Sequence, residues 1–180
     1  MRFCVSLFVL IFFQTTIFGQ NENIAFYSLD LPFSARSAVL NQPIAIHDKD
    51  VEIGITNPSV LNPQNHGNLS LNFVDYFADI HFLSVAYAFP FRNFGTMAVS
   101  VKSIGYGEFI ETDYTSQSYG TFGANEQIAS VNLSKSLSNR WHIGSSVKTI
   151  ISNLENYQSI ALVGDLSILY TNYQKNLFVS

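Results

Sequence analysis

The chain is poor in residues that most soluble domains use for crosslinking, catalysis and solubility. It has one cysteine, Cys4, and 12% charged residues, about half the usual share. Because Cys4 lies within the first twenty residues, the rest of the chain has no disulfide, thiolate nucleophile or cysteine metal ligand. The nine lysines and arginines are scattered. This argues against a nucleic-acid surface, because phosphate binding needs clustered cations.

Residues 1–20 have the pattern of a secretory signal peptide. Arg2 provides the positive start, residues 3–13 are apolar, and small or polar residues follow. The alternative is a membrane anchor, but the uninterrupted apolar run Leu7–Phe13 is much shorter than the roughly 20 residues of a spanning helix. We therefore expect export, with cleavage near Gly19 or Gln20.

Alternation with a period of two dominates the chain after residue 66. In the clearest case, Val131 and Leu133 alternate with Ser130 and Asn132. The alternating segments are 68–76, 80–89, 95–104, 129–137, 140–151 and 159–171, and a seventh begins at residue 177. Each is about ten residues long, the length of a tilted strand that crosses a membrane. The pattern predicts an all-β fold with about seven antiparallel strands.

The links between these segments differ in length. Three short links, 91–94, 138–140 and 173–176, each hold one cation beside an Asn. Between them we expect longer polar connections at 106–123 and 152–158. Alternation of short and long links is typical of outer-membrane barrels, which have tight periplasmic turns and longer external loops. The short link at 76–79 departs from this pattern.

Aromatic residues are abundant, with 16 Phe and 9 Tyr at a net charge of −4. Many of them fall at the ends of the alternating segments, as in the interfacial girdles of membrane barrels. Low charge with many aromatics suits a wall that faces lipid rather than water. The alternative is a soluble β-sandwich whose core is aromatic. Together, segment length, link asymmetry and low charge favour a transmembrane antiparallel β-barrel.

The chain before residue 66 lacks this alternation. Leu31–Leu40 is predicted to form a short helix capped at Ser34. Two Asn-Pro pairs, Asn57-Pro58 and Asn62-Pro63, precede the first strand. We interpret this part as a compact plug. The predicted organisation is a signal peptide at 1–20, a plug segment at 21–66 and a β-barrel portion at 67–180.

Few residues suggest a specific chemistry. Asp48, Asp50 and Glu52, beside His47, have the oxygen ligands that calcium prefers, but they lack the spacing of a known calcium loop. A solvated turn is the favoured interpretation. The other histidines do not have the spacing of a zinc site, and no serine is framed as a nucleophile. We therefore expect no metal, no cofactor and no enzymatic activity.

Three polar residues stand out on the later strands. His142 and Lys148 alternate with apolar neighbours, and Asp165 lies on the following segment. Because the interiors of membrane barrels are polar, we expect these side chains to face the lumen. A structural role is favoured over a binding role.

A family resemblance adds to this pattern. It is carried by Ser34–Ala38, Asp48–Asp50 and Asn57–Leu61, with Asn57-Pro58 as the motif of the plug segment. Further stretches in the same order are 73–80, 84–88, 104–107, 154–157 and 164–166. Together they resemble the PorQ-like proteins among the FadL-like barrels of the type IX secretion system. The likeness covers nearly all of the chain after the signal peptide.

The resemblance implies a FadL-like barrel of about fourteen strands in the outer membrane. It also implies a non-enzymatic scaffold, in contact with outer-membrane lipid, that anchors a PorZ-type surface partner beside PorU and PorV. Since only about seven strands fit here, we expect the chain to be the N-terminal part of the barrel. Two alternatives remain: a FadL-type transporter of a hydrophobic solute and a soluble periplasmic binding module.

Overall fold

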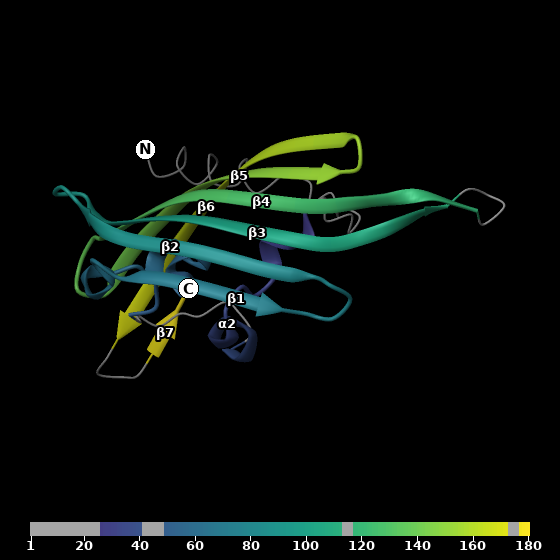
Figure 1. Ribbon diagram of the computed structural model, residues 1–180. Coiled ribbons are helices and arrows are strands. Elements are labelled where there is room, and N and C mark those ends of the chain that lie inside the picture. The colour runs from purple at the N-terminus through teal and green to yellow at the C-terminus, as the bar shows by residue number, and fades with distance from the viewer. Residues whose placement is uncertain (1–25, 41–48, 113–116, 173–176) are drawn as a thin grey trace, which may run out of the picture.

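The computed structural model describes residues 26–40, 49–112, 117–172 and 177–180, and the predicted signal peptide lies outside them. The helices are η1 Tyr27–Asp30, α2 Ala35–Leu40, α3 Val51–Thr56, η2 Pro58–Val60 and η3 Pro63–Asn65. The strands are β1 Leu69–Asp75, β2 His81–Phe91, β3 Gly95–Thr112, β4 Ser118–Ser136, β5 Trp141–Leu154, β6 Tyr157–Asn172 and β7 Leu177–Val179. The predicted all-β class is confirmed (Figure 1).

The strands form one seven-stranded sheet in sequence order, each antiparallel to the next. The sheet is long and curved, and the N-terminal helices lie within the curve (Figure 1). Within the described residues β1 and β7 each pair with one neighbour, so the sheet does not close. Closure into a barrel requires the edge strands to pair. The antiparallel sheet is therefore confirmed, whereas the barrel is not.

All of the predicted alternating segments are strands, but the predicted long connection at 106–123 is wrong. β3 and β4 continue past their neighbours as a two-stranded ribbon, with Phe109 stacked on Phe122 at 5.4 Å between ring centroids. The register shifts between Gly105 and Glu108, and Gly107 has a φ of +77°. This bulge interrupts the alternation and hides the ribbon in the sequence.

The predicted long connection at 152–158 is also wrong. β5 continues to Leu154 and β6 begins at Tyr157, which leaves a two-residue turn. Glu155 in this turn has a φ of +53°. The polar residues before and after it pair through their backbones, as in the partners Ser152 and Ser159. Backbone pairing does not depend on side-chain polarity, so a polar stretch can extend a strand.

The N-terminal segment, meaning described residues 26–40 and 49–66, packs across one face of the sheet. The predicted helix at its start is confirmed, since the Ser37 amide donates to the Ser34 hydroxyl at 3.1 Å. Asp50 caps α3 by accepting from the Glu52 amide at 2.9 Å. Helix α3 contacts β1 to β4, and η2 contacts β4 to β6. The segment therefore reaches six neighbouring strands.

Candidate functional site

The two faces of the sheet have opposite chemical character. The face under the N-terminal segment, called the polar face, includes Ser70, Asn72, Ser84, Ser100, Lys102, Ser130, Asn132, Ser146, Asp165 and Thr171. The opposite face, called the apolar face, includes Leu69, Leu71, Phe73, Leu83, Val85, Val101, Val131, Val147, Leu162, Leu166 and Ile168. Ser84 and Asn132 are completely buried, whereas Leu162 is 75% exposed and Leu166 is 90% exposed. In a soluble sheet with one covered face, the apolar side chains are covered and the polar side chains face water.

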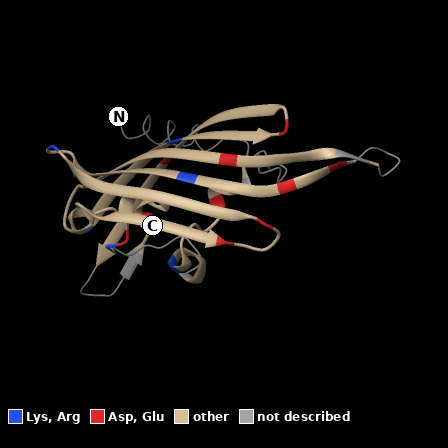
Figure 2. Ribbon diagram, viewed as in Figure 1, with Lys and Arg blue, Asp and Glu red and all other residues tan. Residues whose placement is uncertain are grey.

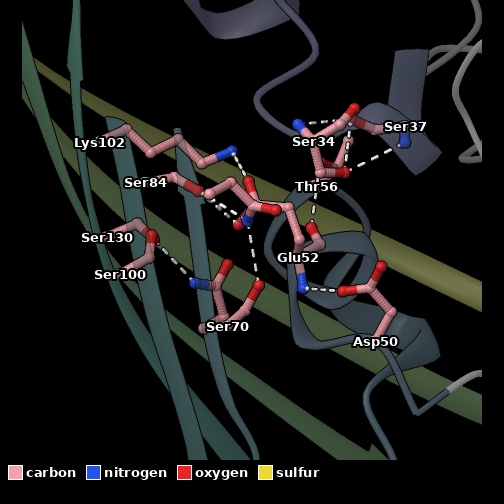
Figure 3. Close-up of polar contacts among 12 residues, drawn as sticks. Ser34, Ser37, Asp50, Glu52, Thr56, Ser70, Ser84, Ser100, Lys102 and Ser130 are labelled. Carbon is pink, nitrogen blue, oxygen red and sulfur yellow. Dashed lines mark hydrogen bonds and ion pairs between the residues drawn. The ribbon is translucent and has the colours of Figure 1, made fainter. Parts of the chain in front are cut away.

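The centre of the polar face holds a buried ion pair. Glu52 projects from the first turn of α3, and its Oε1 lies 2.5 Å from the Lys102 Nζ on β3. Both side chains are largely buried. The second carboxylate oxygen of Glu52 accepts from the Ser84 hydroxyl at 3.3 Å. The Lys102 Nζ also lies 4.6 Å from the centre of the Phe33 ring. A helix and two strands therefore meet at one charged contact (Figure 3).

Hydroxyl and amide groups extend this contact along the sheet. The Asn72 amide donates to the Ser84 hydroxyl at 3.1 Å. On the next strands the Ser100 and Ser130 hydroxyls lie 2.7 Å apart, and the Asn132 amide donates to Ser130 at 2.9 Å. Buried polar groups need such partners, because an unpaired one costs roughly 1–3 kcal/mol. Hydrogen bonds within the polar face therefore offset part of the cost of covering its polar groups.

The three residues predicted to face the lumen all lie on the polar face, on β5 and β6. The Lys148 Nζ is 2.7 Å from Asp165 Oδ2, which also accepts from the Ser146 hydroxyl at 2.7 Å. His142 is farther along β5, with its Nδ1 at 2.9 Å from the Ser136 hydroxyl. The structure therefore brings Lys148 and Asp165 together and leaves His142 apart. That this face lines a lumen stays a prediction.

The predicted Asn57-Pro58 motif lies where the N-terminal segment contacts β5. Asn57 ends α3, and its side chain accepts from the Ser59 hydroxyl at 2.7 Å. The Ser59 amide donates to the Ser167 hydroxyl on β6 at 3.0 Å. A Cβ atom added to Gly144 would lie 2.2 Å from the Ser59 amide nitrogen and 2.4 Å from the Pro58 carbonyl carbon. The Asn57-Pro58 motif therefore packs directly against the backbone of Gly144, where a side chain would not fit.

The acidic cluster near residue 50 is not a solvated turn. Asp50 is a helix cap, and Glu52 is buried against Lys102. His47 and Asp48 lie outside the described residues. The part of the chain that the structure describes contains no group of three or more metal-ligating side chains. The earlier interpretation was wrong for Glu52 because it considered local polarity only.

Sequence reasoning missed the pairing of Glu52 with Lys102 and the role of Gly144. Two signals were present in the sequence. Glu52 is the single charge in the apolar run 51–55, and Lys102 is the single charge in segment 95–104. An isolated charge among apolar residues often has a buried partner. Neither signal identifies that partner, because the two residues lie on separate elements.

A cavity of about 950 Å³ opens between the N-terminal segment and β6. Its lining includes Asp30, Pro32 and Asn57 on one side, with Lys148, Asp165 and Ser167 on the other. The cavity is therefore mixed in polarity and contains a bonded ion pair. It has room for a small solute.

No described helix is both long and apolar enough to cross a membrane. Comparison with known proteins found no matching family model, no similar curated protein and no similar solved structure.

Proposed function

We propose that the seven-stranded sheet is part of the wall of an outer-membrane β-barrel, with the N-terminal segment as a plug on its lumen side. The observation that carries this proposal is that the apolar face of the sheet is exposed while its polar face is covered. Exposed side chains such as Leu162 and Leu166 would each lose favourable burial in water, at about 25 cal/mol per Å² of apolar area. In a bilayer the same side chains face hydrocarbon, and the polar groups stay covered inside.

The edge strands of the sheet are a second argument for a larger barrel. β1 and β7 lack a second neighbour within the described residues. In hydrocarbon each unsatisfied backbone group costs several kcal/mol, so both edges have to be paired. The proposed barrel therefore includes further strands between them. This agrees with the FadL-like barrel of about fourteen strands that the resemblance implies.

For the role of the barrel we propose a non-enzymatic scaffold of type IX secretion. Two structural features support this choice. A buried ion pair and the contact of Pro58 with Gly144 hold the N-terminal segment on the sheet. The β3–β4 ribbon projects beyond the neighbouring strands (Figure 1). We propose that it is the surface for a PorZ-type partner beside PorU and PorV. The alternative, transport of a hydrophobic solute, is supported by the cavity beside Lys148 and Asp165.

The membrane location predicts an asymmetric response to charge. Val147 lies near the middle of β5 on the apolar face, and Tyr157 lies at the turn-proximal start of β6. Val147→Arg should destabilise the chain folded in vesicles by about 2–4 kcal/mol, and the control Tyr157→Arg by about 0–1 kcal/mol. Denaturant titration in bilayers measures both values. Equal costs, with improved solubility without detergent, would favour a soluble module instead.

If the protein is a scaffold, removal of the ribbon should abolish partner binding without affecting membrane insertion. Replacing residues 106–124 with Asn-Gly joins β3 to β4 at the paired positions 105 and 125 and keeps the rest of the sheet. We expect normal insertion but loss of the PorZ-type partner from purified complexes. Quantitative pull-down from the outer membrane measures this. Retained partner with reduced uptake of a hydrophobic solute would favour the transporter.

A further inference from the structure

The two ends of the sheet carry opposite charges in their turns (Figure 2). At one end the links after β2 and β4 hold Arg92 and Arg140, and Lys135 lies close by near the end of β4. At the other end β1 finishes at Asp75, and the ribbon and the links after β1 and β5 hold Asp79, Glu108, Glu111 and Glu155. One end is therefore positive and the other negative.

The cations at the positive end are exposed. Arg92, Lys135 and Arg140 make no ion pair with any residue that the structure describes. The Lys135 Nζ lies 5.6 Å from the centre of the Phe94 ring, on the apolar face. Trp141 packs on Tyr170 nearby, with ring centroids 4.9 Å apart. Amphipathic rings beside cations are typical of the membrane–water interface.

An apolar groove begins next to Lys135. It has a volume of about 480 Å³ and lies on the apolar face over β4, β5 and β6. Its floor includes Ser145, which is paired with Leu133 on one side and Leu166 on the other. A small side chain between two large ones leaves this hollow. Ile143 and Ile168 line the part of the groove nearest to Lys135.

We propose that this groove binds an acyl chain of an anionic phospholipid whose phosphate pairs with Lys135. The inference rests on the proposed membrane location. Lys135 makes no ion pair within the described residues, so it can pair with an anion, and the adjoining apolar groove selects an amphiphile rather than a free phosphate. Arg92 and Arg140 lie in the same headgroup layer and add long-range attraction. The acidic opposite end repels the same lipid, so binding also orients the sheet.

The fluorescence of Trp141 reports lipid binding directly, because Trp141 is the only tryptophan and begins the strand that contains Ile143. The full chain is reconstituted in vesicles of phosphatidylcholine and phosphatidylglycerol, with one lipid brominated at a time. We expect brominated phosphatidylglycerol to quench Trp141 at a concentration about fivefold lower, the ratio equivalent to ~1 kcal/mol per basic residue near an anionic surface. Lys135→Gln should lower this preference markedly, with only the long-range attraction of Arg92 and Arg140 left.

Two further variants separate the groove from general charge. Ser145→Leu fills the groove from its floor without removing a cation, and it should also lower the preference. Lys49→Gln removes an exposed cation of the N-terminal segment and should leave the preference unchanged. Circular dichroism checks that each variant keeps its β content.

The outcomes distinguish this lipid site from the membrane location. Equal quenching by the two brominated lipids, or an unchanged preference in Lys135→Gln, overturns the lipid site while the membrane location stands. Absence of quenching by either lipid overturns the membrane location itself. Loss of the preference in Lys49→Gln would mean that net charge, rather than the groove, attracts the lipid.

Discussion

Lys102→Ala should lower the free energy of unfolding by about 3–5 kcal/mol, because it leaves Glu52 buried without its cation. The Ser84 hydroxyl remains beside the carboxylate, but one neutral donor cannot balance a buried charge. Urea titration of the folded chain in detergent micelles, followed by Trp141 fluorescence, measures the change. Lys102 is therefore expected to be among the most sensitive positions of the sheet.

Two variants test the cause of this loss. Lys135→Ala removes an exposed lysine that makes no ion pair with the residues the structure describes, and it should change stability by no more than about 0.5 kcal/mol. The double variant Glu52→Leu, Lys102→Met replaces both charges with apolar groups and should recover most of the stability. If Lys102→Ala were as mild as Lys135→Ala, the ion pair would not anchor the N-terminal segment.

Gly144→Val should release the N-terminal segment from the sheet. The added side chain would enter the space of the Pro58 and Ser59 backbone, which cannot rotate away as a flexible side chain can. It would also break the hydrogen bond from the Ser59 amide to Ser167. Overpacking of this kind costs about 1–3 kcal/mol. Lys49 is already exposed, so limited trypsin digestion should cleave after it faster in the variant than in the wild-type chain.

Gly164→Ala is the matched control for this substitution. Gly164 is on the neighbouring strand β6, and an added Cβ would meet nothing closer than 3.9 Å. Its trypsin pattern should equal that of the wild-type chain. An unchanged pattern in Gly144→Val would mean that Pro58 does not depend on this close contact.

Much of the sheet was predictable from the sequence because the relevant signal is local. Successive side chains of a strand point to opposite faces, so alternation such as that in 129–137 identifies both the strand and its two faces. The same signal fails where the strand departs from a regular pleat. The bulge at Gly107 and the polar residues before Glu155 made strands look like loops.

The candidate site was less predictable. Lys148 and Asp165 were correctly assigned to one face, since they lie on consecutive strands. Glu52 was placed in a turn, because nothing near it in the sequence shows that α3 lies against β3. A contact between distant elements depends on how the chain packs, and residue spacing does not contain that information.

The sequence by itself determined the all-β class, the positions of the alternating strands and the separation of polar from apolar side chains, because these follow from local backbone geometry. Only the tertiary structure decided which face is covered. The N-terminal segment lies on the polar face, where it completes an ion pair and buried hydrogen bonds, and it leaves the apolar face exposed. Period-two alternation is the same for either arrangement, so long-range packing alone could distinguish them.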